Sequence, residues 1–240
     1  MWRKNDPIPG DYQYRALHEG FAPQRFWHEA KGLAIAALAP PPADGLAVDL
    51  GCGSGVVTNL LAEAGCDVLG VDASAEAIAF AEATWGGARV RFQQSDAAAF
   101  DLGGRKARAF YCLECIEHIS PEKATAMLQR CVANLEPGGR VFLTTPNYRS
   151  AWPAIEYVLD RTRLVPPLDG AQHITRYTPA ALRRLAEDAD CEVETLRTMC
   201  LAAPWLNLIS HGAAVRVHRW EIRRFRSWGP ILAAVLRPRG

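Results

Sequence analysis

The sequence predicts an α/β fold: a doubly wound, mostly parallel sheet of seven strands with helices on both faces. Short apolar runs alternate with segments of helical periodicity along most of the chain, which is the pattern of consecutive strand–helix–strand units. One apolar run, at residues 48–50, breaks into the glycine-rich sequence GCGSG at 51–55 and then into a helical segment. The 240 residues, of which 49% are hydrophobic, suffice for one large domain with a substantial core.

The expected elements follow one another in a regular order. Strands are expected to begin near Ala47, Asp67, Val90, Ala109, Arg140, Cys191 and Ile231. Helices are expected over Ala30–Ala39, Val56–Ala64, Ala75–Thr84, Pro121–Asn134 and Pro179–Asp188. The last of these has a typical start, with Thr178 as N-cap and proline at the first helical position. Because right-handed crossovers join parallel strands, a ligand is expected at their carboxyl ends.

A single domain is expected to cover residues 1–240, with three additions to the sheet. Residues 1–45 are expected to form an N-terminal helical cap. An insertion at 148–178 follows the fifth strand and is expected to act as a lid over the ligand side of the sheet. Its apolar and aromatic residues are Trp152, Ile155, Tyr157, Val158, Leu159, Leu164 and Val165. An amphipathic helix that only completes the core is the alternative interpretation.

The third addition, at 205–228, is a basic amphipathic segment before the last strand. Residues 211–240 carry seven arginines against one glutamate. The basic face is expected to hold Arg216, Arg219, Arg223 and Arg226, opposite an apolar face of Ala213, Val217, Trp220, Phe225 and Trp228. Arginine with tryptophan on such a helix is typical of peripheral membrane contact, and a helix that packs on its own domain is the alternative.

Composition limits the partners and the compartment. The net charge of +1 provides no global field for nucleic acid, and no nucleic-acid-binding module is recognisable. No apolar segment follows the first six residues, so no secretory signal is expected. Seven cysteines, an odd number in a chain of this size, favour the reducing cytoplasm. We therefore expect a cytoplasmic protein, peripheral at the inner face of the membrane if the basic segment binds lipid.

The glycine loop and a later aspartate predict a nucleotide-like ligand. Gly51, Gly53 and Gly55 let the backbone approach a ligand closely, and the following helix offers unpaired N–H donors. Asp72 ends the next apolar run, about 20 residues on, where a ribose diol would lie. The glycines alternate and do not form G-x-G-x-x-G, which disfavours a nicotinamide dehydrogenase. A tight turn without a ligand would leave Asp72 unexplained.

These motifs resemble those of the class I S-adenosylmethionine (SAM) methyltransferases, whose Rossmann-like sheet has seven strands. The resemblance runs from about Phe26 to about Pro238 and includes Gln94-Ser95-Asp96 and the LEPGG turn at 135–139. It implies SAM as cofactor, with the loop, Cys52 included, under the methionine part. It also implies that Asp72 holds the ribose hydroxyls and that Asp96 holds the adenine edge.

The segment Glu114-Cys115-Ile116-Glu117-His118 carries the expected chemistry. If the chain is helical there, positions 114, 117 and 118 share one face, and they could hold Mg²⁺, Mn²⁺ or Zn²⁺. This E-x-x-E-H sequence resembles that of the quinone-pathway O-methyltransferases of polyprenylated catechols, in which these residues are associated with a divalent metal. The resemblance also implies that Lys31, an arginine in those relatives, and Leu113 border SAM. A solvated helix start is the alternative.

We therefore expect a SAM-dependent methyltransferase that methylates an oxygen of a lipophilic or aromatic, quinol- or catechol-like molecule. A phenol has a pKa near ~10, so either a cation at this segment or His118 as general base would assist its deprotonation, with Glu117 as the second catalytic residue. His173 and Tyr177 are expected to pack or cap, with a place in the lining of the pocket as the alternative. A lipid-linked or glycan-type acceptor is the alternative substrate, and a SAM-binding regulator without turnover is the alternative outside enzymes.

Overall fold

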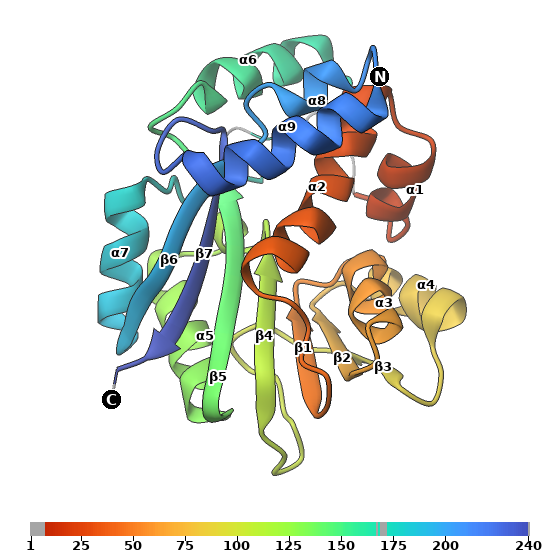
Figure 1. Ribbon diagram of the computed structural model, residues 1–240. Helices are drawn as coiled ribbons and strands as arrows, with labels where there is room; N and C mark the ends of the chain where they lie inside the picture. Colours follow the sequence, from red (N-terminus) through yellow and green to blue (C-terminus); the bar gives the residue numbers. More distant parts are fainter. Residues whose placement is uncertain (1–7, 167, 169–171, 240) are drawn as a thin grey trace.

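The computed structural model describes residues 8–166, 168 and 172–239. Its strands form one seven-stranded sheet in the order β3-β2-β1-β4-β5-β7-β6 (Figure 1). The strands are β1 Leu46–Leu50, β2 Asp67–Asp72, β3 Val90–Gln94, β4 Ala107–Leu113, β5 Leu135–Pro146, β6 Cys191–Met199 and β7 Ile231–Pro238. The first five pair in parallel, and β7 runs antiparallel to both of its neighbours. The predicted fold class is confirmed.

Helices cover both faces of this sheet (Figure 1). They are α1 Tyr12–His18, α2 Ala22–Leu38, α3 Val56–Glu63, α4 Ala75–Trp85, α5 Pro121–Ala133, α6 Trp152–Thr162, α7 Pro179–Asp188, α8 Ala203–Leu206 and α9 His211–Arg224. Alternate residues of β4 supply the two cores. Phe110 and Cys112 pack toward α5 and α7, whereas Tyr111 and Leu113 belong to the cluster formed with α2, α3, α8 and α9. Strand periodicity therefore produces the two-faced core.

Two boundaries differ from those expected. The first long helix, α2, begins at Ala22 and not near Ala30, because Pro23 occupies its first turn and Phe21 precedes it in an extended conformation, which favours a helix start. Strand β5 begins at Leu135 and not near Arg140, so the turn sequence after α5 is already part of the strand. The first seven residues of the expected N-terminal cap lie outside the described residues.

The expected basic face of the basic segment is exposed, but its expected apolar face is wrong in register. The buried residues of α9 are Ala214, His218, Glu221 and Ile222. The reason is a buried polar anchor: the Glu221 carboxylate accepts the backbone N–H groups of Leu201 (3.2 Å), Ala202 (2.7 Å) and Ala203 (3.3 Å). Two residues of the expected apolar face, Trp220 and Trp228, are instead 53% and 74% exposed.

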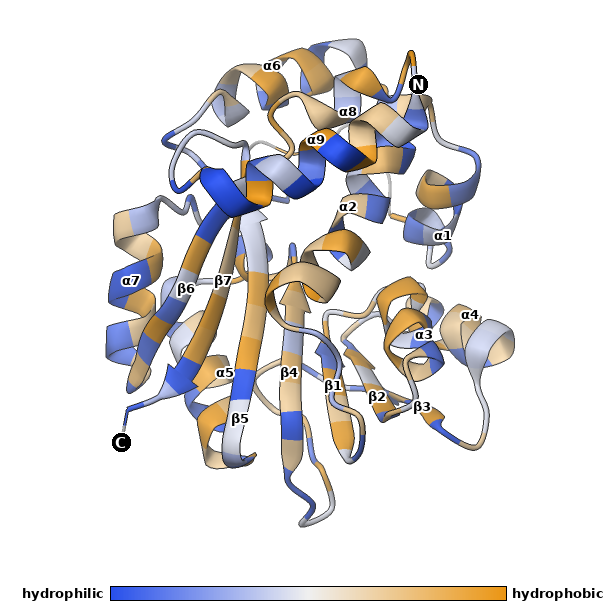
Figure 2. Cartoon of the chain, in the orientation of Figure 1, coloured by the Kyte–Doolittle hydropathy of each residue, from blue (hydrophilic) through white to orange (hydrophobic). Residues whose placement is uncertain are grey.

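The carboxyl ends of the parallel strands point toward the end of the sheet where α1, α6, α8 and α9 lie (Figure 1). Figure 2 shows that the middle of the sheet is largely hydrophobic, while the upper end of β5 is neutral and α9 presents several hydrophilic segments. Both insertions and the N-terminal helices thus gather at the edge where a ligand is expected. Among the helices in the described part of the chain, none is long and apolar enough to cross a membrane.

Candidate active site

A cavity of about 660 Å³ opens at the carboxyl edge of the sheet, within the size range of small-molecule and cofactor sites. It is lined by α1, α2, the loops after β1 to β4, the 148–178 insertion and α8. One half lies against the glycine loop, and the other lies against the insertion. We call these the cofactor half and the acceptor half.

The glycine loop in the cofactor half adopts a conformation that excludes side chains. The backbone N–H groups of Gly51 and Cys52 donate to the carbonyl of Val71 on the neighbouring strand, at 2.8 and 3.1 Å. Gly51 has φ +72°, and a Cβ there would lie 2.7 Å from Cys115 Sγ. Only glycine fits this position without strain, so the loop offers bare backbone to the cavity, as the sequence predicts.

Asp72 lies beside this loop with a fixed carboxylate. Its Oδ2 accepts the N–H of Gly53 and its Oδ1 accepts the N–H of Ser74, both at 2.8 Å. A carboxylate has about four acceptor positions, so each oxygen can accept one further hydrogen bond from a ribose diol. Helix α1 also contacts the glycine loop, because the backbone N–H of Tyr14 donates to Ser54 Oγ at 2.9 Å.

Asp96 lies further along the same wall, after β3. Its Oδ1 accepts the N–H of Ala98 at 2.9 Å, and its other oxygen pairs with Lys123. Burial alone would raise the pKa of Asp96, but the hydrogen bonds from Lys123 and Ala98 outweigh it and hold that pKa below its usual range. Asp96 is therefore ionised, and the resemblance described above implies that it contacts the adenine edge.

The expected cofactor residues do not all reach the cavity. Lys31, Gly51, Gly53, Asp72 and Asp96 line it. The others, Cys52, Gly55 and Leu113, are not among its lining residues; all three are buried beneath the surface of the site.

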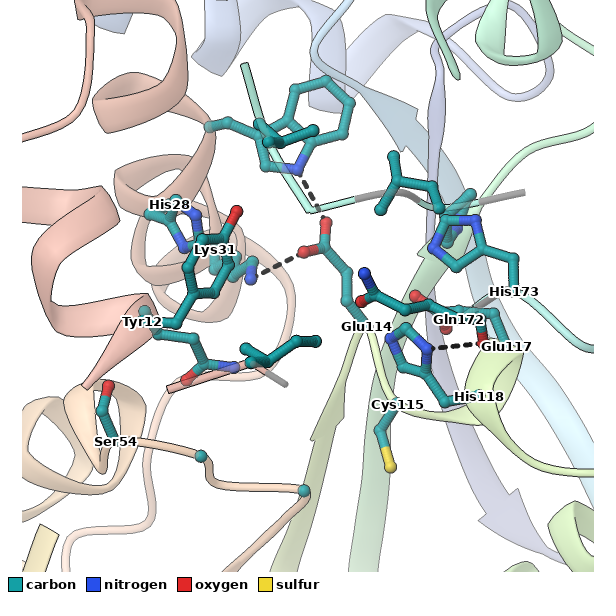
Figure 3. Close-up of a pocket in the computed structure, with 18 of the residues that line it drawn as sticks. Tyr12, His28, Lys31, Ser54, Glu114, Cys115, Glu117, His118, Gln172 and His173 are labelled. Carbon is teal, nitrogen blue, oxygen red and sulfur yellow. Dashed lines mark hydrogen bonds and ion pairs between the residues drawn. The ribbon is translucent and has the colours of Figure 1, made fainter. Parts of the chain in front are cut away.

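Glu114 lies where the two halves meet, and its carboxylate faces α2 (Figure 3). Its Oε2 is 2.7 Å from Lys31 Nζ, and its Oε1 accepts the indole N–H of Trp27 at 2.9 Å. Although burial would raise the pKa of Glu114, the Lys31 ammonium outweighs it and lowers that pKa. Glu114 has φ +51° and precedes the short 3₁₀ turn at Ile116–His118. The expectation that 114, 117 and 118 share one helical face is therefore wrong.

Glu117 and His118 face the acceptor half together with a residue from the insertion, His173 (Figure 3). One ligand atom from each of the three lies within 4.8 Å of the others, and no Glu114 atom belongs to this group. The His118 Nδ1 lies 2.9 Å from the carbonyl oxygen of Gln172. Since a carbonyl only accepts, Nδ1 carries the proton and His118 Nε2 keeps its lone pair.

Burial sets the protonation of this group. Burial, together with the nearby Glu114 carboxylate, raises the pKa of Glu117 to about 7, while Thr145 Oγ1 donates to its Oε2 at 2.9 Å. Burial also lowers the pKa of His118 below its ordinary value. A buried carboxyl and a neutral imidazole with shifted pKa values are typical of a catalytic site.

Aromatic rings form one wall of the acceptor half. The ring of Trp27 on α2 lies 5.3 Å from that of Trp152 on α6, and Trp152 lies 6.0 Å from the ring of His173. The sequence identified the insertion but not the contribution of α2. His173 lines the cavity, which was the alternative to a packing role, whereas Tyr177 is buried outside it.

Three features define a class I SAM-dependent methyltransferase. The order of the strands reverses direction between β1 and β4, the glycine loop after β1 presents bare backbone, and hydrogen bonds fix the Asp72 carboxylate at the end of β2.

Comparison with known proteins agrees with this class. A family described as "Methyltransferase domain" matches residues 24–196. The ubiquinone biosynthesis O-methyltransferase of Methylococcus capsulatus is 33% identical over 61% of this chain and 63% of its own length, so the match spans less than two thirds of that relative. The enzyme of the same name from Xanthomonas axonopodis pv. citri is 30% identical over 69% of this chain and 70% of its own.

Solved structures share the fold. An S-adenosylmethionine-dependent methyltransferase from Mesorhizobium loti superposes with a TM-score of 0.64, covering 87% of this chain and 97% of its own at 18% identity. The chain belongs to the methyltransferase-domain family and is a SAM-dependent methyltransferase.

Proposed function

We propose that this methyltransferase methylates an oxygen of a lipophilic aromatic acceptor of the quinol or catechol type. The observation that carries the proposal is the juxtaposition, in the acceptor half, of a buried carboxyl and two histidines with a wall of tryptophan rings. Polar groups that handle a hydroxyl beside apolar rings suit a hydroxylated aromatic molecule. The names of the relatives from Methylococcus and Xanthomonas support the same acceptor class.

The residues divide the work between the two halves. SAM, when bound, supplies a methyl group activated by its sulfonium. In this proposal the glycine loop, Asp72, Asp96 and Lys31 hold it, which leaves the acceptor half to align the hydroxyl for in-line transfer. His118 Nε2 faces the cavity with a free lone pair, so it would take the hydroxyl proton as the methyl group passes from the sulfonium, which leaves as a neutral thioether, to the oxygen.

A divalent cation is the second way in which the site could favour loss of the hydroxyl proton. Carboxylate and imidazole ligands suit Mn²⁺ or Zn²⁺, and Mg²⁺ where oxygen ligands dominate. A cation at Glu117 and His118 would stabilise the acceptor oxyanion near neutral pH. Activity should then fall in chelator and return with Mg²⁺, Mn²⁺ or Zn²⁺. Full activity in chelator would leave His118 as the base without a metal.

Membrane contact is part of the proposal, because a lipophilic acceptor must be taken from a lipid phase. Ile174 and Trp205 line the cavity and are exposed, and so are Leu208 and Ile209, which follow Trp205 closely in the chain. The arginines of the basic segment, 216, 219, 223 and 226, are all exposed. Each arginine near an anionic surface is worth about 1 kcal/mol.

Sedimentation with anionic liposomes tests this contact. Binding should weaken as salt rises, since the Debye length is ~10 Å at 0.1 M. Replacing Arg216, Arg219, Arg223 and Arg226 by glutamine should abolish binding, whereas replacing Arg183 and Arg184 on α7 should not. Equal sedimentation of the first variant and the wild type would mean that α9 only packs on its own domain.

An acceptor screen tests the proposed function itself. The full chain is incubated with methyl-labelled SAM and pooled catechols, quinols, amines, glycans and lipid extracts, and the label is followed into the product. Transfer to catechols or quinols supports the proposal. Transfer only to glycans or lipid-linked acceptors would favour the alternative substrate class, and transfer only to amines would overturn O-methylation.

A further inference from the structure

Two histidines from different elements line the acceptor half side by side (Figure 3). His118 belongs to the 3₁₀ turn after β4, whereas His173 belongs to the 148–178 insertion. Their rings lie 5.3 Å apart, and a nitrogen of one lies within 4.8 Å of a nitrogen of the other. In the proposed function His118 takes the hydroxyl proton, and no step uses His173.

A buried carboxylate orients the His173 ring. The His173 Nδ1 lies 2.6 Å from Glu156 Oε1 and 3.1 Å from the hydroxyl of Tyr148, which itself donates to the same Glu156 oxygen at 2.7 Å. His173 and Glu156 are only 6% and 4% exposed. Because a carboxylate accepts hydrogen bonds, Nδ1 carries the proton, and Nε2 of the neutral imidazole keeps its lone pair.

The backbone on both sides of His173 is fixed as well. The N–H of His173 donates to the carbonyl of Leu168 at 2.9 Å. The N–H groups of Ile174 and Thr175 donate to the carbonyl of Glu117, at 2.8 and 3.0 Å. A side chain held by packing and by hydrogen bonds of this kind is pre-organised for binding, so the Nε2 lone pair keeps one direction.

The two imidazoles therefore offer two hydrogen-bond acceptors close together. The His118 Nδ1 faces the carbonyl of Gln172 at 2.9 Å, so the His118 Nε2 also keeps its lone pair. An aromatic ring with one hydroxyl can donate to only one of these nitrogens. Two neighbouring hydroxyls, whose oxygens lie a hydrogen-bond distance of ~2.8 Å apart, can donate to both, whereas hydroxyls at opposite ends of a ring point away from each other.

We propose that His173 is the residue that recognises the second hydroxyl of the acceptor, and that Glu156 is the positioning residue of His173. This inference rests on the proposed function and deepens it. A buried acceptor that is left without a donor is costly, so the pair of nitrogens selects a ring with neighbouring hydroxyls over a ring with one.

The same contact limits the protein to one methyl transfer. Transfer turns the hydroxyl beside His118 into a methyl ether, while the hydroxyl proton goes to His118 Nε2 and the sulfonium leaves as a neutral thioether. An ether oxygen has no hydrogen to donate, so beside His173 it incurs the same cost as a missing hydroxyl. The product is therefore disfavoured in the reversed orientation that a second transfer needs.

Calorimetric titration with three acceptors tests this role of His173. The full chain is saturated with S-adenosylhomocysteine, which prevents turnover, and is kept in chelator, so that no bound cation contacts the hydroxyls. The acceptors are a catechol, the phenol that lacks its second hydroxyl, and the monomethyl ether of the catechol, all with the same hydrophobic side chain. The wild type should bind the catechol about 10–100-fold more tightly than the other two, because each of these leaves one buried nitrogen unpaired.

His173→Asn is the most informative variant. Its amide can still donate to Glu156 from the place of Nδ1, but nothing replaces Nε2, so the preference for the catechol should fall below about threefold at unchanged affinity for S-adenosylhomocysteine. His173→Gln places an amide near the position of Nε2 and should restore part of the preference over the phenol. Glu156→Gln keeps the shape but no longer fixes the tautomer of His173, and should lower the preference several-fold.

His211→Asn is the matched control, because it makes the same substitution at an exposed histidine, on α9. It should keep the wild-type preference. Wild-type preference in His173→Asn, or in Glu156→Gln if only that variant folds, would overturn the inference. A wild type that binds all three acceptors alike would overturn it too and would leave the proposed function standing, since each acceptor carries an aromatic hydroxyl. Binding of none of them would contradict the proposed function and, with it, this inference.

Discussion

Replacing Asp72 by alanine should separate cofactor binding from folding. In the proposed complex its carboxylate accepts two hydrogen bonds from the ribose diol of SAM, and losing both should cost roughly 2–4 kcal/mol. Because 1.4 kcal/mol is a factor of ten, Asp72→Ala should weaken SAM binding by about 10². The N–H groups of Gly53 and Ser74 lose their acceptor as well, but both lie near solvent, and water can replace it.

Calorimetric titration of the variant with SAM measures this effect. Asp67→Ala is the control, since Asp67 begins the same strand that Asp72 ends and is exposed at the far edge of the sheet. The control should bind SAM as the wild type does, and both variants should unfold cooperatively. A SAM affinity for Asp72→Ala within threefold of the wild type would refute the assignment of the ribose site.

Three further predictions concern Glu117, Gly51 and His218. Glu117→Gln should lower turnover by about 10²-fold or more while the calorimetric SAM affinity stays unchanged, because the side chain lies in the acceptor half. Gly51→Ala should lower the free energy of unfolding in urea by about 1–2 kcal/mol, owing to φ +72°. Burial lowers the pKa of His218 to about 4, so the unfolded state binds the extra proton and stability falls as pH drops from about 6.5 to 4. His218→Leu should remove about 3 kcal/mol of that acid-induced loss, as measured by denaturation at pH 7 and pH 4.

The fold and the cofactor half could be predicted because their signals are local. Gly51 and Asp72 each end an apolar run of strand length, and parallel pairing of β1 with β2 brings the ends of those runs together. Seven strand positions could be predicted for the same reason, since each depends on a few consecutive residues.

The acceptor half could be predicted only in part, because it depends on contacts between distant segments. His173 reaches Glu117 across 56 residues of chain, and no periodicity relates the two positions. The direction of the Glu114 side chain was predicted wrongly because Glu114 itself has a left-handed backbone conformation before the 3₁₀ turn. Such a φ is uncommon outside glycine. Trp27 joins the site only because α2 begins eight residues earlier than its apolar pattern indicated.

The face of α9 could not be predicted because polar residues form much of its buried side. His218 and Glu221 are both buried there, and a pattern of apolar residues alone assigns such positions to solvent. Glu221 is held by backbone N–H groups of the loop after β6, a contact that only the folded chain provides.

The most direct test of the account is the position of the transferred methyl group. The protein is incubated with ¹³C-methyl SAM and a catechol that carries a hydrophobic side chain, and the product is examined by NMR and mass spectrometry. The account predicts one label per product, bonded to a catechol oxygen, and at least 10²-fold less product with Glu117→Gln. Label on carbon or nitrogen, or equal product from the Glu117 variant, would contradict it.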